Sequence, residues 1–113
     1  FILCPESAAD AGYRANLKSA RSRTTRLTPV ISGRPARGLV NRLMDHGEAA
    51  GSPPPADYPV AYDLGKQLHA AAMKAGSTDF AAHWAGQGAP SARELPAAAL
   101  VQTLVEELRS APD

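Results

Sequence analysis

Three consecutive prolines, Pro53–Pro55, set the strongest limit on how this chain of 113 residues can fold. Proline lacks a backbone N–H and fixes φ, so neither a helix interior nor a central strand can run through them. The surrounding stretch from Gly47 to Asp57 also holds glycine and serine, and it favours an extended polyproline conformation at the surface. We therefore expect a linker that ends at Asp57.

The composition predicts a small core. The 44% hydrophobic fraction is inflated by alanine, which buries little area per residue, and large apolar side chains are sparse. The single cysteine, Cys4, excludes an internal disulfide and fits a reducing compartment. Its place in an apolar run predicts a small buried hydrophobe rather than a nucleophile. No apolar run approaches the ~18 residues that cross a membrane, so we expect a soluble cytoplasmic protein.

Charge is distributed unevenly along the chain. Residues 1–46 carry eight Lys or Arg against three acids, which gives +5, and residues 47–113 carry four against eight, which gives −4. A basic segment can bind nucleic acid, but the arginines here alternate with Ser, Thr and Gly, and no aromatic platform lies among them. We expect no nucleic-acid partner. Phosphate from a cofactor, or plain surface solvation, explains the arginines better.

The first residues predict a strand and a helix. Phe1–Cys4 is an apolar run ended by proline, as in a buried strand. A lone strand has no partner for its backbone groups, so we expect the rest of its sheet in a preceding part of a larger protein. Ser7 is placed to cap a helix over 8–20.

The remaining pattern predicts mostly helices. The expected elements are an extended segment over 24–31, a loop over 32–38, helices over 39–46, 60–75 and 79–85, a loop over 86–88, and a helix over 96–110. The last helix carries an apolar stripe at the helical period, which should pack on another part of the structure: Leu100, Val101, Leu104, Val105 and Leu108.

Tyr58, Tyr62 and Lys66 stand four residues apart, which is the spacing of one helix face. Side chains at this spacing lie about 6 Å apart from turn to turn. Two phenols and an ammonium in one row can line a pocket for an anionic, partly planar ligand. The alternative is an amphipathic helix whose tyrosines half-bury their rings while the lysine stem covers apolar surface.

Two further segments have the residue types of a binding site. Gln87 lies between glycines, of which Gly86 allows close approach of a ligand, and Trp84 can either stack on a flat ring or anchor a helix. The loop over 32–38 holds two arginines, which either bind an anion or tie the loop to its neighbours. The three histidines show no metal-ligand spacing, so no metal site is predicted.

In order along the chain, the segments 1–7 (Phe-Ile-Leu-Cys-Pro-Glu-Ser), 32–37 (Ser-Gly-Arg-Pro-Ala-Arg), 58–66 (Tyr-Pro-x-x-Tyr-x-x-x-Lys) and 84–87 (Trp-Ala-Gly-Gln) resemble the C-terminal part of the nitronate monooxygenases, formerly called 2-nitropropane dioxygenases. The second and fourth segments are the more specific pair. The Tyr/Tyr/Lys row points to the class that oxidises propionate 3-nitronate.

The resemblance implies an α/β fold, namely the C-terminal fragment of an FMN-binding (β/α)8 barrel with an added, mostly helical subdomain. Such a barrel needs ~250 residues, so the fragment itself should be mainly α-helical. Residues 1–23 would form the last barrel strand and its helix. Residues 24–57 would form an extended segment, a short helix and the linker, and residues 58–113 a helical substrate-side subdomain with the C-terminal helix.

The resemblance also assigns roles. Tyr58, Tyr62 and Lys66 would bind the nitronate, and Lys66, Trp84, Gly86 and Gln87 would contact FMN. The family's catalytic histidine lies upstream, so no catalytic role is assigned in this chain.

The implied reaction is oxidation of a nitronate by oxygen, with no nucleic-acid or membrane partner, and the fragment alone would be inactive. The alternatives are an NAD(P)H:quinone reductase of the same fold and a small helical interaction module that docks through the apolar stripe.

Overall fold

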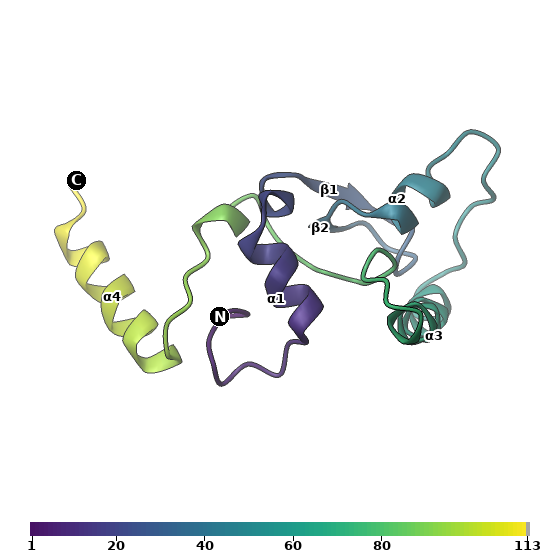
Figure 1. Cartoon of the computed structure of the whole chain (residues 1–113). Coiled ribbons are helices and arrows are strands. Elements are labelled where there is room, and N and C mark those ends of the chain that lie inside the picture. Colours follow the sequence, from purple (N-terminus) through teal and green to yellow (C-terminus); the bar gives the residue numbers. More distant parts are fainter. Residues whose placement is uncertain (113) are drawn as a thin grey trace.

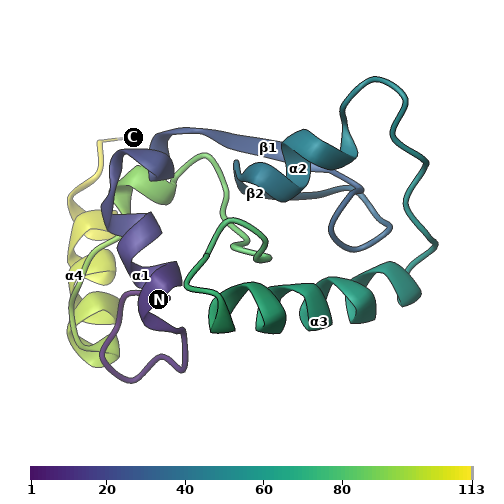
Figure 2. The ribbon, with the colours of Figure 1, turned by 45° about the vertical axis from the view of Figure 1, so that its right-hand side comes forward.

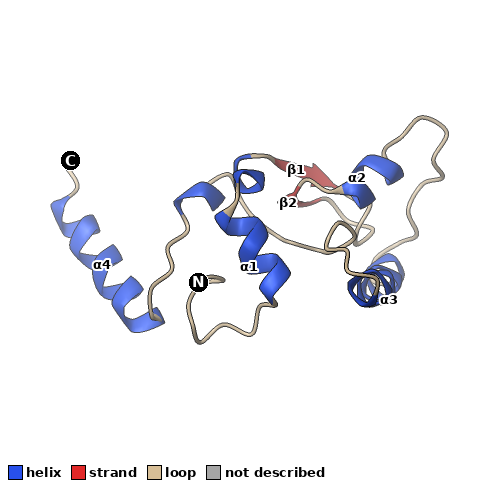
Figure 3. Ribbon diagram, in the orientation of Figure 1, coloured by secondary structure: helices blue, strands red, loops and turns tan. Residues whose placement is uncertain are grey.

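The computed structural model describes residues 1–112, so Asp113, the last residue of the predicted segment 58–113, lies outside it. The secondary structure is mostly helical (Figures 1 and 3). In chain order the elements are α1 (Ala11–Lys18), η1 (Ala20–Arg23), β1 (Thr25–Thr28), β2 (Ala36–Leu39), α2 (Arg42–Gly47), α3 (Val60–Lys74), η2 (Ala89–Ser91) and α4 (Ala97–Ser110).

A two-stranded antiparallel hairpin follows α1 and η1 in the chain. β1 pairs with β2 in the register Thr25 with Leu39, and β1 ends just before Pro29, which cannot donate to a ladder. The segment around Trp84 adds to the free side of β2: Leu39 N donates to His83 O over 2.9 Å, and Ala85 N donates to Arg37 O over 3.1 Å. The hairpin thereby fixes the position of His83 and Trp84.

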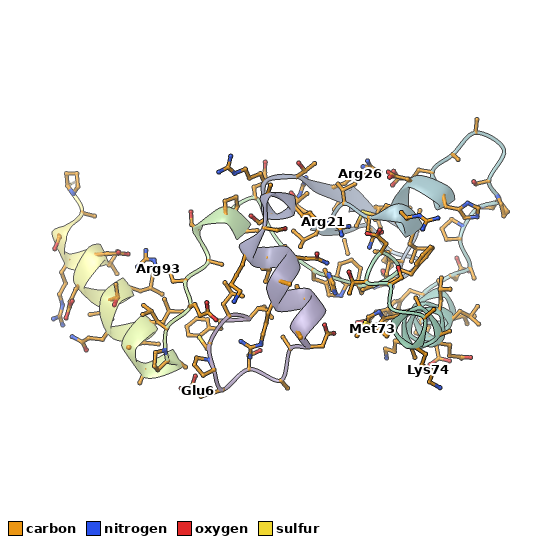
Figure 4. All side chains as sticks on the ribbon, in the orientation of Figure 1. Glu6, Arg21, Arg26, Met73, Lys74 and Arg93 are labelled. Atoms are coloured by element: carbon orange, nitrogen blue, oxygen red, sulfur yellow. The ribbon has the colours of Figure 1, made fainter. Side chains whose placement is uncertain are left out.

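The main core cluster is small, as the composition predicted. Leu3, Leu17 and Leu39 form it, with Tyr13 and Ala85 packed against them. Ion pairs join further segments outside this cluster. Arg21 pairs with Asp79, and Arg26 pairs with two carboxylates of the α2 region (Figure 4). The helix α1 is capped by Asp10, whose carboxylate accepts from Tyr13 N over 2.8 Å.

The two long helices lie at opposite ends of the molecule (Figures 1 and 2). α3 follows the proline-rich linker and ends at Lys74, and Gly76 just beyond it adopts φ +78°, as predicted for the residue that terminates a helix. α4 begins after Pro96, also as predicted, but Leu100 is its only buried residue. The rest of the predicted apolar stripe is exposed, up to 78% at Leu108, rather than packed on another element.

Three local predictions were wrong. Phe1–Cys4 forms turns, with Cys4 N donating to Phe1 O, because no strand within residues 1–112 pairs with it. The segment 79–85 is not a helix, because it pairs with β2 instead. The loop predicted over 32–38 contains most of β2. In addition, the helix predicted over 8–20 is shorter, since Asp10 rather than Ser7 caps it.

No helix within the described residues has the length and hydropathy needed to span a membrane. The division of the chain at residues 23 and 57 into barrel, linker and substrate-side parts stays a prediction.

Candidate functional site

Tyr58, Tyr62 and Lys66 form a continuous row beside an open hollow. The two tyrosine rings are 6.5 Å apart between centroids and inclined by 23°, and Lys66 Nζ lies 4.6 Å from the centre of the Tyr62 ring. The hollow has a volume of about 500 Å³, and Val60 and Leu64 supply apolar surface to it. Tyr58 lies before the first residue of α3, yet its ring lies in line with the side chains of the two residues on the helix, Tyr62 and Lys66. The structure therefore brings the three residues of the row together.

Arg34 extends the row at the Tyr58 end. Its guanidinium carbon lies 5.3 Å from the centre of the Tyr58 ring, within the range of a cation–π contact. Gly33 makes this possible because it adopts φ +84° and approaches the backbone before α3 so closely that a Cβ would lie 2.5 Å from Tyr58 N. Arg34 therefore contacts a neighbour within the protein, Tyr58. The sequence had left open whether the loop arginines bind an anion or hold the loop to its neighbours.

Trp84 lies next to the row, whereas Gly86 borders a different hollow. The Trp84 and Tyr62 rings are 6.2 Å apart and tilted by 50°. Gly86 borders a separate hollow of about 150 Å³, with Trp84 and Phe1. Within residues 1–112 neither of the two hollows that Lys66 lines, nor its ring contact, includes Gln87. The predicted cofactor-binding residues are therefore only partly gathered.

Behind the row lies a second, smaller cavity, which we call the histidine cavity. Its volume is about 180 Å³, and its walls include Asp10, Tyr13, Tyr62, Lys66, His69 and His83. The Tyr13 and His83 rings stack 4.5 Å apart and within 2° of parallel, and the His69 ring stands nearly perpendicular to His83 at 6.3 Å. This cavity joins α1, α3 and the segment that pairs with β2.

Burial controls protonation in the histidine cavity. It lowers the pKa of His83, and the nearby His69 and Arg21 lower it further, although Asp10 and Asp79 act in the opposite direction. Burial also raises the pKa of Tyr13, an effect that Asp10 increases. The Tyr13 hydroxyl donates to Trp84 O. Both side chains are therefore neutral at neutral pH.

Sequence reasoning missed three residues of this region: Tyr13, His69 and His83. Tyr13 and His83 are 70 residues apart, so no local spacing relates them. For His69, its position on the same helix as Lys66, three residues further on, was an available signal, because that spacing places both on one face. Within the described residues no group of three or more potential ligands lies close enough to hold a metal ion.

The residues around Trp84 fit one wall of a site for a flat, anionic cofactor. A Cβ added to Gly86 would meet nothing within 4 Å, so a ring can approach its backbone. Trp84 and Tyr62 offer aromatic surface, and Lys66 offers a positive charge.

Comparison with known proteins identifies the family of this chain. The family model described as nitronate monooxygenase matches residues 1–107. The chain belongs to this family. A nitronate monooxygenase of Pseudomonas aeruginosa is 59% identical over 109 residues, and one of Paraburkholderia phytofirmans is 49% identical over the same length. Each match covers 96% of this chain and 31% or 30% of the relative.

A solved structure shares the fold. The chain is similar to the nitroalkane oxidase of Streptomyces ansochromogenes, with a TM-score of 0.85 and 42% identity over 97% of this chain and 31% of that one. This family member therefore spans about a third of the length of the relatives and the structure that it matches.

Proposed function

We propose that this chain acts as part of a longer enzyme that oxidises alkyl nitronates with molecular oxygen and uses FMN. The observation that carries the proposal is the row of Tyr58, Tyr62 and Lys66 beside the open hollow, in a chain of the nitronate monooxygenase family. A nitronate is a small planar anion, and the row presents aromatic faces and one ammonium to such a molecule.

Each side chain has a task in this proposal. Lys66 supplies charge to hold the anion, and the two phenols donate hydrogen bonds to the nitronate oxygens. The exposed faces of Val60 and Leu64 exclude water around the bound molecule. FMN, when bound, supplies the electron acceptor for the oxidation. The chain alone, which holds one wall of the site, should be inactive.

Replacing Lys66 tests the proposal in the full-length protein. Lys66→Met should lower kcat/KM for a nitronate by one to three powers of ten, or roughly 1.4–4 kcal/mol, because the anion loses its counter-charge. Lys74→Met is the matched control, since Lys74 is exposed in the last turn of the same helix (Figure 4). Equal kinetics for the two variants would refute the role of Lys66.

A rate comparison separates this activity from quinone reduction by the same fold. We expect nitronate-dependent oxygen uptake to exceed NADH oxidation in the presence of a quinone. The opposite order would assign the protein to the reductases.

A further inference from the structure

The place of Tyr58 in the row is not set by helix geometry alone. Tyr62 and Lys66 lie one turn apart on α3, so the helix fixes their separation. Tyr58 lies before the first residue of α3 and is about half exposed. Its ring nevertheless lies 6.5 Å from the Tyr62 ring, inclined by 23°. Another segment must therefore help to hold it there.

The loop between β1 and β2 approaches both parts of the row. On one side, Gly33 adopts φ +84°, and a Cβ added to it would lie 2.5 Å from Tyr58 N. On the other side, a Cβ added to Gly65 in α3 would lie 3.0 Å from Ile31 O. Backbone atoms cannot rotate out of the way as a side chain can, so both approaches are close and stiff. The loop therefore sets the position of Tyr58 relative to α3.

The loop is itself anchored in the fold. Ile31 is only 2% exposed, and Gly33 N donates to Pro29 O over 2.8 Å. The hydroxyl of Ser32, a buried residue, donates to Arg34 O over 3.0 Å. The side chain of Arg34 therefore starts from a fixed backbone.

Arg34 extends this order from the backbone to the Tyr58 ring. Its guanidinium carbon lies 5.3 Å from the ring centre. A cation is attracted to the face of a ring and not to its edge, so the contact favours one orientation of a ring whose terminal torsion is otherwise broad. Both residues are exposed, so the contact can be removed without a change in the core.

We propose that Arg34 is a positioning residue of the site: it holds the Tyr58 ring in the row and acts on the nitronate only through that ring. Its effect on turnover rests on the proposed function. In this arrangement the two cations of the row have different tasks, since Lys66 meets the anion and Arg34 orders the phenol that donates to it.

The test is a double-mutant cycle in the full-length protein, with the nitronate of 1-nitropropane as substrate. Arg34→Met removes the cation and keeps an apolar stem. We expect it to raise KM about two- to fivefold with kcat little changed, because an ordered phenol contributes to binding of the anion. Tyr58→Leu should also raise KM, and adding Arg34→Met to it should have no further effect. Arg109→Met, at an exposed arginine of α4, should keep the wild-type KM.

Two kinetic results would overturn the positioning role. One is an unchanged KM in Arg34→Met. The other is a further rise in KM when Arg34→Met is added to Tyr58→Leu, because the arginine would then bind the anion itself.

A second measurement does not depend on turnover. If the wild type oxidises no nitronate, the proposed function is refuted, and NMR relaxation of isotope-labelled tyrosine rings in the full-length protein still tests the positioning. The Tyr58 signal is identified by its absence from Tyr58→Leu. It should report a more mobile ring in Arg34→Met than in the wild type or in Arg109→Met, and equal mobility in all three would refute the proposal.

Discussion

The protonation state of His83 couples the histidine cavity to the stability of the fold. Burial lowers its pKa from 6.5, so the folded state favours the neutral ring more than the unfolded state does. The unfolded chain then binds the proton at a higher pH than the folded chain. The contribution to stability is complete above pH 6.5 and is lost progressively as the pH falls below that value.

We therefore expect the free energy of unfolding of the full-length protein to decline below pH 6.5 and the decline to be smaller in His83→Phe. Urea titrations on both sides of that pH measure it. His46→Phe should keep the wild-type dependence. An identical slope for His83→Phe and the wild type would show that other groups cause it.

At the residue scale, spacing predicted what one helix can bring together. Tyr62 and Lys66 lie a single turn apart, so their contact follows from helix geometry. The contact of Arg34 with Tyr58 depends on a glycine conformation, and the stack of Tyr13 on His83 depends on pairing between distant segments. Neither is encoded in a local pattern. The assignment of Tyr58, Tyr62 and Lys66 to substrate stays a prediction. So does the assignment of Lys66, Trp84, Gly86 and Gln87 to FMN.

At the element scale, the approach of the segment 83–85 to β2 requires a residue without a side chain at position 38. A Cβ on Gly38 would lie 3.0 Å from His83 O, and that oxygen is held by its bond to Leu39 N. The backbone therefore cannot retreat without loss of the pairing.

Gly38→Ala should destabilise the full-length protein by about 1–3 kcal/mol, because the added methyl overpacks a fixed contact. Gly88→Ala is the matched control, since a Cβ there would meet nothing within 4 Å. Chemical denaturation of both variants gives the comparison. A loss of stability as small in Gly38→Ala as in Gly88→Ala would mean that the segment moves easily.

The elements that the sequence predicted well are those fixed by local chemistry. α3 and α4 have helical periodicity and clear ends, and the proline-rich linker contains no helix or strand after Gly47, the last residue of α2. The prediction of a helix over 79–85 was wrong because the segment pairs with β2, which lies more than 40 residues earlier in the chain. A local sequence pattern does not indicate such a pairing. The short strand β2 was missed for a different reason: its residues, Ala36–Leu39, show no strand pattern, and only their pairing with β1 makes them a strand.

At the scale of the whole molecule, the chain is extended and thinly packed. Its radius of gyration is 16.1 Å, against about 13 Å for a compact domain of this length. It measures 50 × 34 × 26 Å, and several large apolar side chains of α3 and α4 are exposed. Residues 1–112 therefore bury little apolar surface for the number of residues that they order.

Expressed alone, the chain should show no cooperative unfolding transition and should bind FMN weakly or not at all. The core around Leu17 is too small to offset the loss of chain entropy. Calorimetry and binding of a hydrophobic dye measure this, with the full-length protein as the control. A single sharp transition, with no dye bound, would instead support an autonomous helical module that docks through α4.

The contact of Trp84 with Tyr62 gives the chain an internal optical reporter. Trp84 is its only tryptophan, and its indole lies 6.2 Å from the ring that borders both the hollow and the histidine cavity. A molecule that enters either space changes the polarity around this fluorophore and shifts its emission. In a full-length protein whose other tryptophans are replaced by phenylalanine, occupancy can be followed without a label and without turnover.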